Sequence, residues 1–95
     1  MNTEFEWDPT KAKSNQQKHD ISFVEAATVF FDPLSVTVSD PSHSIEEKRF
    51  VITGLSYQRR AIVVVHVDRG DRIRIISARL ATSSERHKYE SGHEF

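Results

Sequence analysis

The stretch "RIRIISARLATSSE", residues 72–85, holds the most informative pattern in the chain. Arg72 and Arg74 alternate with isoleucines, as expected for a strand with one apolar face, but the alternation breaks at residues 75–76. With perfect pleating Arg79 would share the isoleucine face, and burying an unpaired guanidinium costs several kcal/mol. A one-residue β-bulge near Ile76 would move Ser77 and Arg79 to the side of Arg74. We therefore predict a bulge there and a row of arginines on one face.

The segments around this strand predict an α+β domain. "TSSE" (Thr82, Glu85) is a capping box that opens a last helix ending near Gly92. Asp8-Pro9 opens a polar helix, and a second capping box at Ser22 opens an amphipathic helix that stops near residues 32–33. Strands are expected at residues 3–8, 34–40, 49–56, 61–68 and 72–80.

The connections between the later strands are too short for parallel pairing, apart from a polar loop at residues 39–44. The expected architecture is two N-terminal helices packed on one face of a mainly antiparallel sheet of four to five strands, followed by a C-terminal helix. The strand at residues 61–68 is expected to be central, because apolar residues occupy consecutive positions in it.

Length and composition indicate a single domain, residues 1–95, without disulfides. The chain has no cysteine, no N-terminal pattern of a signal peptide and no apolar run long enough to span a bilayer. We expect a soluble cytoplasmic protein. The net charge of −1 hides an asymmetry, since all eight arginines lie in residues 49–95 and nine of the fourteen carboxylates in residues 1–48. This favours either a salt-bridged surface or a local basic face for a polyanion.

Two further groups of residues are candidate sites, each with an ordinary structural alternative. Lys11, Asn15 and Lys18 share one face of the first helix, with His19 adjacent. Lys18 and His19 could transfer protons, or could simply complement the C-terminal dipole of that helix. His66 lies on the apolar face of the central strand, where a hydrogen-bonded core histidine is the usual interpretation. The arginine row has its own alternative, cross-strand ion pairs with Asp68 or Asp71.

The sequence contains none of the motifs that supply a metal, a nucleophile or a phosphate-binding loop. There is no HExxH, CxxC or GxSxG, and three glycines do not form a Gly-rich loop. A reaction that needs none of these is RNA cleavage by the 2′-hydroxyl of the RNA itself. It requires a base, an acid and cations around the phosphorane, and Arg, Lys, His and Tyr are the residue types that provide them.

Several motifs in order resemble a known family. "FEWD", the "NxxKH" spacing from Asn15 to His19, "SFxEA", "RIISAR" and "ERxxY" are together similar to the BrnT toxins, RelE-like ribonucleases of bacterial toxin–antitoxin pairs. The resemblance extends from Phe5 to Glu90. It implies a RelE-like fold, metal-independent RNA cleavage that inhibits translation and growth, and no cofactor. It also implies a BrnA-like antitoxin with a ribbon-helix-helix region, a complex of two toxins and two antitoxins, and operator binding only through that complex.

The resemblance also suggests roles for individual residues. The functional surface would carry Arg79 as the phosphate clamp, Lys18 or His19 as base or acid, and Tyr89 as a proton donor or stacking platform; Arg49 and Arg74 would complete it. Asp20 stands where the family usually has glycine, in a helix cap that a left-handed residue fits.

A rival hypothesis is a non-catalytic module whose arginine face holds an acidic partner segment. A Lys, His or Tyr from the two flanking helices, within hydrogen-bond reach of a site shared with Arg74 and Arg79, would favour the enzyme. If those arginines are all locked in salt bridges, the binding module is favoured.

Overall fold

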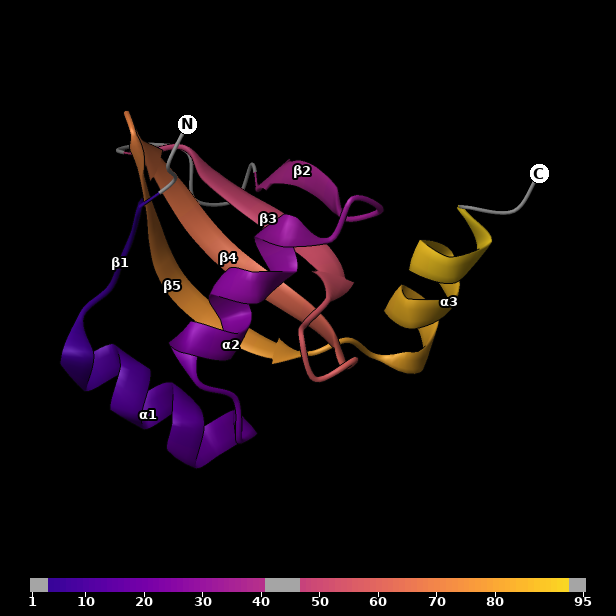
Figure 1. The fold of residues 1–95 in the computed structure, drawn as a ribbon, viewed down its shortest axis with the longest axis horizontal. Helices are drawn as coiled ribbons and strands as arrows, with labels where there is room; N and C mark the ends of the chain where they lie inside the picture. The colour runs from indigo at the N-terminus through magenta and orange to yellow at the C-terminus, as the bar shows by residue number, and fades with distance from the viewer. Residues whose placement is uncertain (1–3, 41–46, 93–95) are drawn as a thin grey trace.

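The computed structural model describes residues 4–40 and 47–92, and in them it has the predicted order of helices and strands (Figure 1). The predicted loop at residues 39–44 lies mostly outside the described residues. The elements are β1 (Glu4–Glu6), α1 (Pro9–His19), α2 (Phe23–Thr28), the 3-10 turn η1 (Val29–Phe31), β2 (Val36–Asp40), β3 (Arg49–Leu55), β4 (Ala61–Arg69), β5 (Arg72–Leu80) and α3 (Ser83–Ser91).

The strands form one five-stranded sheet in the order β1-β5-β4-β3-β2. β1 runs parallel to β5, and the other neighbours are antiparallel. A parallel partner is possible for β1 because α1, α2 and three strands separate it from β5 in the chain. The prediction of a mainly antiparallel sheet is therefore confirmed. β4 is the central strand, as predicted, and Ile62 and Val64 in it are fully buried.

The helix ends follow the predicted capping residues. The Asp8 carboxylate accepts a hydrogen bond from the Thr10 amide at 2.8 Å, and Thr82 and Glu85 form the capping box of α3. Asp20 ends α1 in the left-handed conformation, with φ 56°. The second helix is shorter than predicted, because α2 ends at Thr28 and the chain continues to Phe31 as a 3-10 turn.

Helices α1 and α2 cover one face of the sheet (Figure 1). The core lies between these helices and the sheet. The polar helix α1 is docked by the buried Asn15. Its side-chain amide donates to the Ile21 carbonyl at 3.1 Å and accepts from the Ala78 amide at 3.1 Å. The bond with Ala78 fixes α1 against β5, and the bond with Ile21 fixes it to the segment that leads into α2. Together they supply the docking that the weak apolar stripe of α1 requires. The buried apolar residues are Ile21, Phe23, Ala26, Val29, Ile52, Ile62, Val64, Ile75 and Ala78.

The predicted bulge is present in β5. Val65 of β4 pairs with Ser77, but the next residue, His66, pairs with Ile75, so Ile76 has no cross-strand partner. The extra residue resets the alternation. Ile75 and Ala78 both reach the core, whereas Arg79 is exposed. The bulge therefore keeps the Arg79 guanidinium out of the apolar layer.

His66 is a core residue, as predicted, but the expected hydrogen bond of its ring is not found within residues 4–40 and 47–92. Its ring lies between Phe30, with centroids 4.8 Å apart, and Phe50, at 5.7 Å. Neither ring nitrogen has a hydrogen-bond partner among the described residues, and Nδ1 lies 3.6 Å from the Asp68 carboxylate. Burial lowers the pKa of His66, because the charged form is poorly solvated there.

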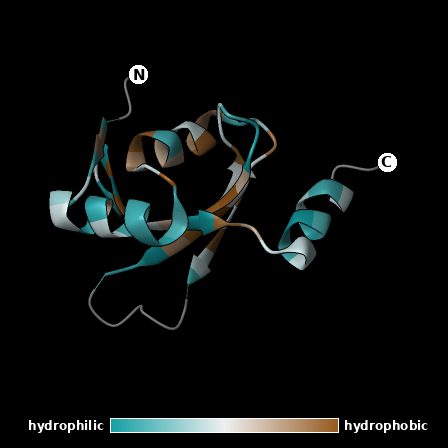
Figure 2. Cartoon of the chain, turned by 90° about the horizontal axis from the view of Figure 1, so that it is seen from below, coloured by the Kyte–Doolittle hydropathy of each residue, from teal (hydrophilic) through white to brown (hydrophobic). Residues whose placement is uncertain are grey.

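Helix α3 is set apart from the rest of the molecule (Figures 1 and 2). Polar residues dominate α3 and α1, whereas α2 and the central strands are more apolar (Figure 2). The Tyr89 side chain, 8% exposed, is the buried residue of α3. None of the described helices is long and apolar enough to cross a membrane.

Candidate functional site

The face of the sheet opposite α1 and α2, which we call the open face, carries all three predicted arginines. The register aligns Arg49 of β3, Val67 of β4 and Arg74 of β5 side by side. Neighbouring strands are about 4.8 Å apart, so the backbones of Arg49 and Arg74 are about 10 Å apart. Arg79 pairs with Val63 further along the same face. The bulge is what places Arg74 and Arg79 on one side of β5.

Arg74 is paired with a carboxylate of β1. Its Nη1 donates to Glu6 Oε2 at 3.0 Å, and Arg72 Nη1 reaches the other oxygen of Glu6 at 3.5 Å. Hydrogen bonding from Arg74, followed by Arg72, lowers the pKa of Glu6 despite some opposing desolvation. The described ion pairs of Arg72 and Arg74 are therefore with glutamates of β1. The alternative prediction had placed these ion pairs with Asp68 or Asp71.

Arg79 is paired with the first turn of α3. Its two terminal nitrogens donate to the two oxygens of Glu85 at 2.7 and 2.8 Å, a bidentate arrangement. Hydrogen bonding from Arg79 is the main reason that the pKa of Glu85 falls to about 2. The pair remains accessible, since the side chains of Arg79 and Glu85 are 45% and 36% exposed.

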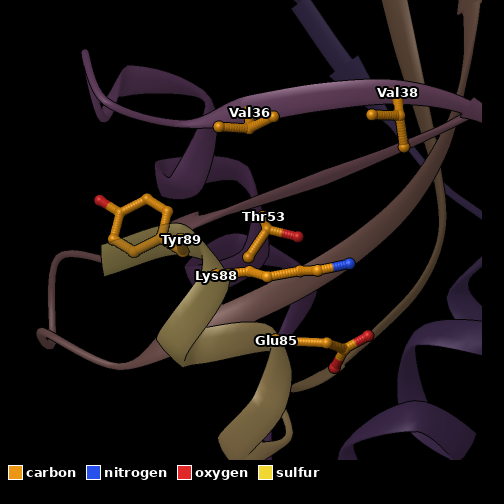
Figure 3. A pocket seen from close by; sticks show the side chains of 6 residues that line it. All are labelled: Val36, Val38, Thr53, Glu85, Lys88 and Tyr89. Atoms are coloured by element: carbon orange, nitrogen blue, oxygen red, sulfur yellow. The ribbon is translucent and has the colours of Figure 1, made fainter. Parts of the chain in front are cut away.

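A pocket of about 270 Å³ lies between α3 and the open face (Figure 3). Lys88 extends into it, in the same general direction as Glu85. Lys88 was not among the residues predicted from the sequence, although its position three residues after Glu85 places both on one side of the helix that the capping box begins. The residues lining this pocket are Val36, Val38, Thr53, Glu85, Lys88 and Tyr89.

The Tyr89 hydroxyl is engaged elsewhere. It donates to Asp32 Oδ2 at 2.5 Å, and in Figure 3 it points away from Lys88 and Glu85. The same Asp32 oxygen accepts the Leu55 amide at 2.8 Å. Burial, then the Asp32 carboxylate, raises the pKa of Tyr89 to about 12. The structure thus uses Tyr89 to attach α3 to the body and does not bring its hydroxyl to the arginines.

Lys18 and His19 lie beside the bulge. Together with Lys11, Asn15 and Ser77 they line a pocket of about 200 Å³ at the edge of β5. This edge is accessible because β1 pairs only with residues 72–74. Ser77 lies between Arg74 and Arg79 along β5, and it pairs with Val65 of β4. Among the described residues, no hydrogen bond or ion pair joins Lys18 or His19 to these arginines, but Ser77 borders both groups.

The arrangement supports parts of both hypotheses. Arg74 and Arg79 are in salt bridges, the geometry expected of a binding module. Lys88, Lys18 and His19 lie on the helices that flank the arginines, which is the placement an enzyme requires, but no described hydrogen bond joins them to Arg74 or Arg79. Within residues 4–40 and 47–92, no three His, Cys, Asp or Glu side chains come together in a group that could hold a metal ion.

The fold and the site define a small α+β protein with arginines on one face of its sheet. Residues 7–85 match the model of the family described as "Ribonuclease toxin, BrnT, of type II toxin-antitoxin system". The chain belongs to this family, which implies an antitoxin partner. A similar solved structure is the Brucella abortus ribonuclease toxin BrnT, with a TM-score of 0.64 and 20% identity, covering 86% of this chain and 100% of that one. No curated protein sequence matches.

Proposed function

We propose that this chain is an endoribonuclease that cleaves RNA without a metal, at a site centred on the β5 bulge. The observation that carries the proposal is the position of Ser77, which borders the arginines of the open face and also the pocket of Lys18 and His19. A phosphate next to Ser77 would have cations on one side and proton-transfer groups on the other.

In this proposal Arg79 and Arg74 bind the phosphate that is cleaved. Their carboxylate partners must then be exchanged for phosphate oxygens. The exposed Arg79–Glu85 pair contributes only about 0–1 kcal/mol, so its exchange costs little. The Arg74–Glu6 pair is half-buried, and separating it costs more. Once bound, the two guanidiniums stabilise the second negative charge that develops in the phosphorane. Arg49 and Lys88 extend the positive surface and contact neighbouring phosphates.

Lys18 or His19 supplies the proton transfers. A base takes the proton of the 2′-hydroxyl, and the 2′-oxygen forms a bond to the adjacent phosphorus. The bond to the 5′-oxygen breaks, and an acid protonates that oxygen. The products are a 2′,3′-cyclic phosphate and a 5′-hydroxyl. Tyr89, in this scheme, acts by holding α3, and with it Lys88, beside the open face.

In the cell the activity would inhibit translation and growth in the cytoplasm. A BrnA-like antitoxin with a ribbon-helix-helix region would neutralise it in a complex of two toxins and two antitoxins. Operator DNA would be bound only through that complex, because no helix-turn-helix spacing is found in this chain and its net charge is −1.

Cleavage in the presence of a chelator tests the proposal. Purified toxin should cut single-stranded RNA in excess EDTA and leave 2′,3′-cyclic phosphate or 3′-phosphate ends. Activity that disappears on chelation and returns with a divalent ion would contradict it.

The second candidate function is capture of an acidic partner segment by the open face. It is favoured by one observation, that carboxylates already occupy both Arg74 and Arg79. A toxin that cuts no RNA, but binds its antitoxin in a way that Arg74→Ala and Arg79→Ala abolish, would establish this function instead.

A further inference from the structure

The turn between β3 and β4, residues 56–60, presents an aromatic side chain and an arginine to solvent. Tyr57 is 64% exposed, and Phe31 of η1 beside it is 71% exposed. Together with Arg59 they line a pocket of about 470 Å³. This volume falls in the range of about 300–1,000 Å³ that is usual for ligand sites. Exposed aromatics next to arginine are the side chains on which bases of single strands stack.

The turn is firmly held from below. Ser56 is buried, donates to Glu25 Oε2 at 2.7 Å and accepts the Gln58 amide at 3.2 Å. The Tyr57 amide donates to the Thr28 hydroxyl at 3.0 Å. Arg60 pairs with the same Glu25. A backbone fixed at both ends of the turn holds the exposed side chains in position before any ligand arrives, and pre-organisation of this kind favours binding.

Arg59 is in a conformation that suits few residues. Its φ is 66°, in the left-handed region, and its amide donates to the Ser56 carbonyl at 2.9 Å. Residues other than glycine, asparagine and aspartate are uncommon in the left-handed region. The fold thus accepts backbone strain at a position where the side chain is a guanidinium that lines the pocket.

A second pocket extends from this turn to the end of β5 and to α3. It has a volume of about 340 Å³, shares Leu55 and Arg59 with the first pocket, and adds Arg86 of α3 and Leu80 of β5. Arg79 donates to the carbonyl of the same Leu80 at 3.2 Å. The two pockets therefore run from Phe31 and Tyr57 to Leu80, the residue that follows Arg79 in β5.

The charges of this surface fit a polyanion. Arg59 and Arg86 line the pockets, and Glu90 is the one acid there without a described hydrogen bond or ion pair. Asp32 also lines the first pocket, but its oxygens accept hydrogen bonds from Leu34, Leu55 and Tyr89. Its charge is directed into the fold.

We propose that the two pockets bind the single-stranded RNA next to the cleaved phosphate, with bases stacked on Tyr57 and Phe31 and phosphates held by Arg59 and Arg86. The choice of RNA as the ligand rests on the proposed function. This subsite would contribute affinity and position the strand, at a distance from the reacting atoms.

A binding measurement with an RNA that cannot be cleaved tests this proposal. The probe is a fluorescein-labelled oligonucleotide of mixed A and U in which every 2′-hydroxyl is methylated, followed by fluorescence anisotropy. Loss of one stacking contact should make Tyr57→Ala bind roughly tenfold more weakly, whereas Tyr57→Phe should bind as the wild type. The matched control is Val24→Ala, which changes another exposed side chain, 63% exposed, outside both pockets.

Arg59→Asn is a second variant, chosen because it should not destabilise the fold. Asparagine tolerates the left-handed conformation better than arginine, so the melting temperature should not fall, while affinity for the probe should drop. Wild-type affinity in both Tyr57→Ala and Arg59→Asn would overturn the proposal. It would also be overturned if these variants lost affinity for the antitoxin and kept it for the probe, because the turn would then be a protein interface.

Cleavage by the wild-type toxin is measured separately, so that the two proposals fail independently. If the wild type cuts RNA but neither variant changes binding, only the subsite is refuted. If the wild type cuts no RNA but binds the probe through Tyr57, only the proposed enzymatic activity is refuted.

Discussion

Two arginine–glutamate pairs, both bidentate, show how position changes the role of one interaction. Arg60 meets Glu25 under the β3–β4 turn, where the Glu25 side chain is only 3% exposed. Arg79 meets Glu85 at the rim of the open face, where the exposed fractions are 45% and 36%. Breaking a buried pair leaves a charge without solvent or partner, whereas water compensates an exposed one. We infer that the first pair stabilises the fold and that the second is available for exchange with a ligand.

The largest expected effect is on cleavage by Arg79→Ala. Removing one group that stabilises the charge of a transition state typically lowers kcat by about 10²–10³-fold. The melting temperature should change little, because the lost ion pair is exposed. The measurement is RNA cleavage alongside thermal unfolding, with Arg72→Ala as the matched control on the same strand. Full toxicity and wild-type cleavage by Arg79→Ala would show that the phosphate is bound elsewhere.

The next prediction compares the two carboxylates directly. Glu25→Gln should lower the free energy of unfolding by about 3 kcal/mol, the lower end for a broken buried pair, because Arg60 retains some contact with water. Glu85→Gln should cost less than about 1 kcal/mol, since the pair is exposed and glutamine preserves the capping box. Urea unfolding of both variants provides the comparison. Equal losses would contradict the distinction between the two pairs.

The same two pairs make the free energy of unfolding depend on pH in the acid range. A carboxyl group with a lowered pKa stabilises the folded state above its unfolded pKa, and this stabilisation is lost as the pH falls toward the folded pKa. For Glu85 that window runs from the ordinary value of 4.5 down to about 2. The Glu25 pKa is lowered as well, mainly by hydrogen bonding from Arg60. Glu25→Gln and Glu85→Gln should therefore each flatten the fall in stability as the pH drops below 4.5.

His66 should give a smaller effect in a different pH range. Its pKa is lowered in the folded state, so the unfolded chain binds the proton more readily and stability falls as the pH drops below the ordinary value of 6.5. His66→Leu removes the titrating group and two buried nitrogens without hydrogen bonds, which should add about 1 kcal/mol at pH 5. Unfolding measured between pH 5 and 7 checks this. A variant with an unchanged pH dependence would contradict it.

An effect of similar size is expected for Tyr89→Phe, with no change in cleavage. It removes one hydrogen bond to Asp32. Such a bond contributes about 1.5–3 kcal/mol when the acceptor is charged. The loss should be smaller than this range, because Leu55 still donates to the same oxygen. We expect a loss near 1 kcal/mol and wild-type cleavage after folding is verified. A large loss of cleavage with unchanged stability would instead identify Tyr89 as a proton donor.

The features that the sequence predicted are those encoded locally. The bulge at Ile76 follows from the break in alternation within one strand, and the caps at Asp8, Ser22 and Thr82 follow from side chains two or three residues from the amides they satisfy. These interactions need no tertiary contact to be recognised.

The partners of the arginines could not be predicted in the same way. Glu6 meets Arg74 only because β1 adds to the sheet in parallel beside β5, across 68 residues of sequence. The Tyr89 hydroxyl reaches Asp32 across 57 residues, and this bond removes it from the arginines. Neither contact has a local signature, so the residues of the site were easier to name than their arrangement.

The central claim is that the RNA supplies the nucleophile and the protein supplies cations and proton transfer. It is tested most directly by an RNA substrate with a single 2′-deoxy substitution at the mapped cleavage position. The account predicts that the toxin binds this RNA as tightly as the all-ribose substrate and does not cut it at that position, while all-ribose RNA yields a 2′,3′-cyclic phosphate. Cleavage of the substituted RNA at the same position would contradict the account, because the nucleophile would then be water or a side chain.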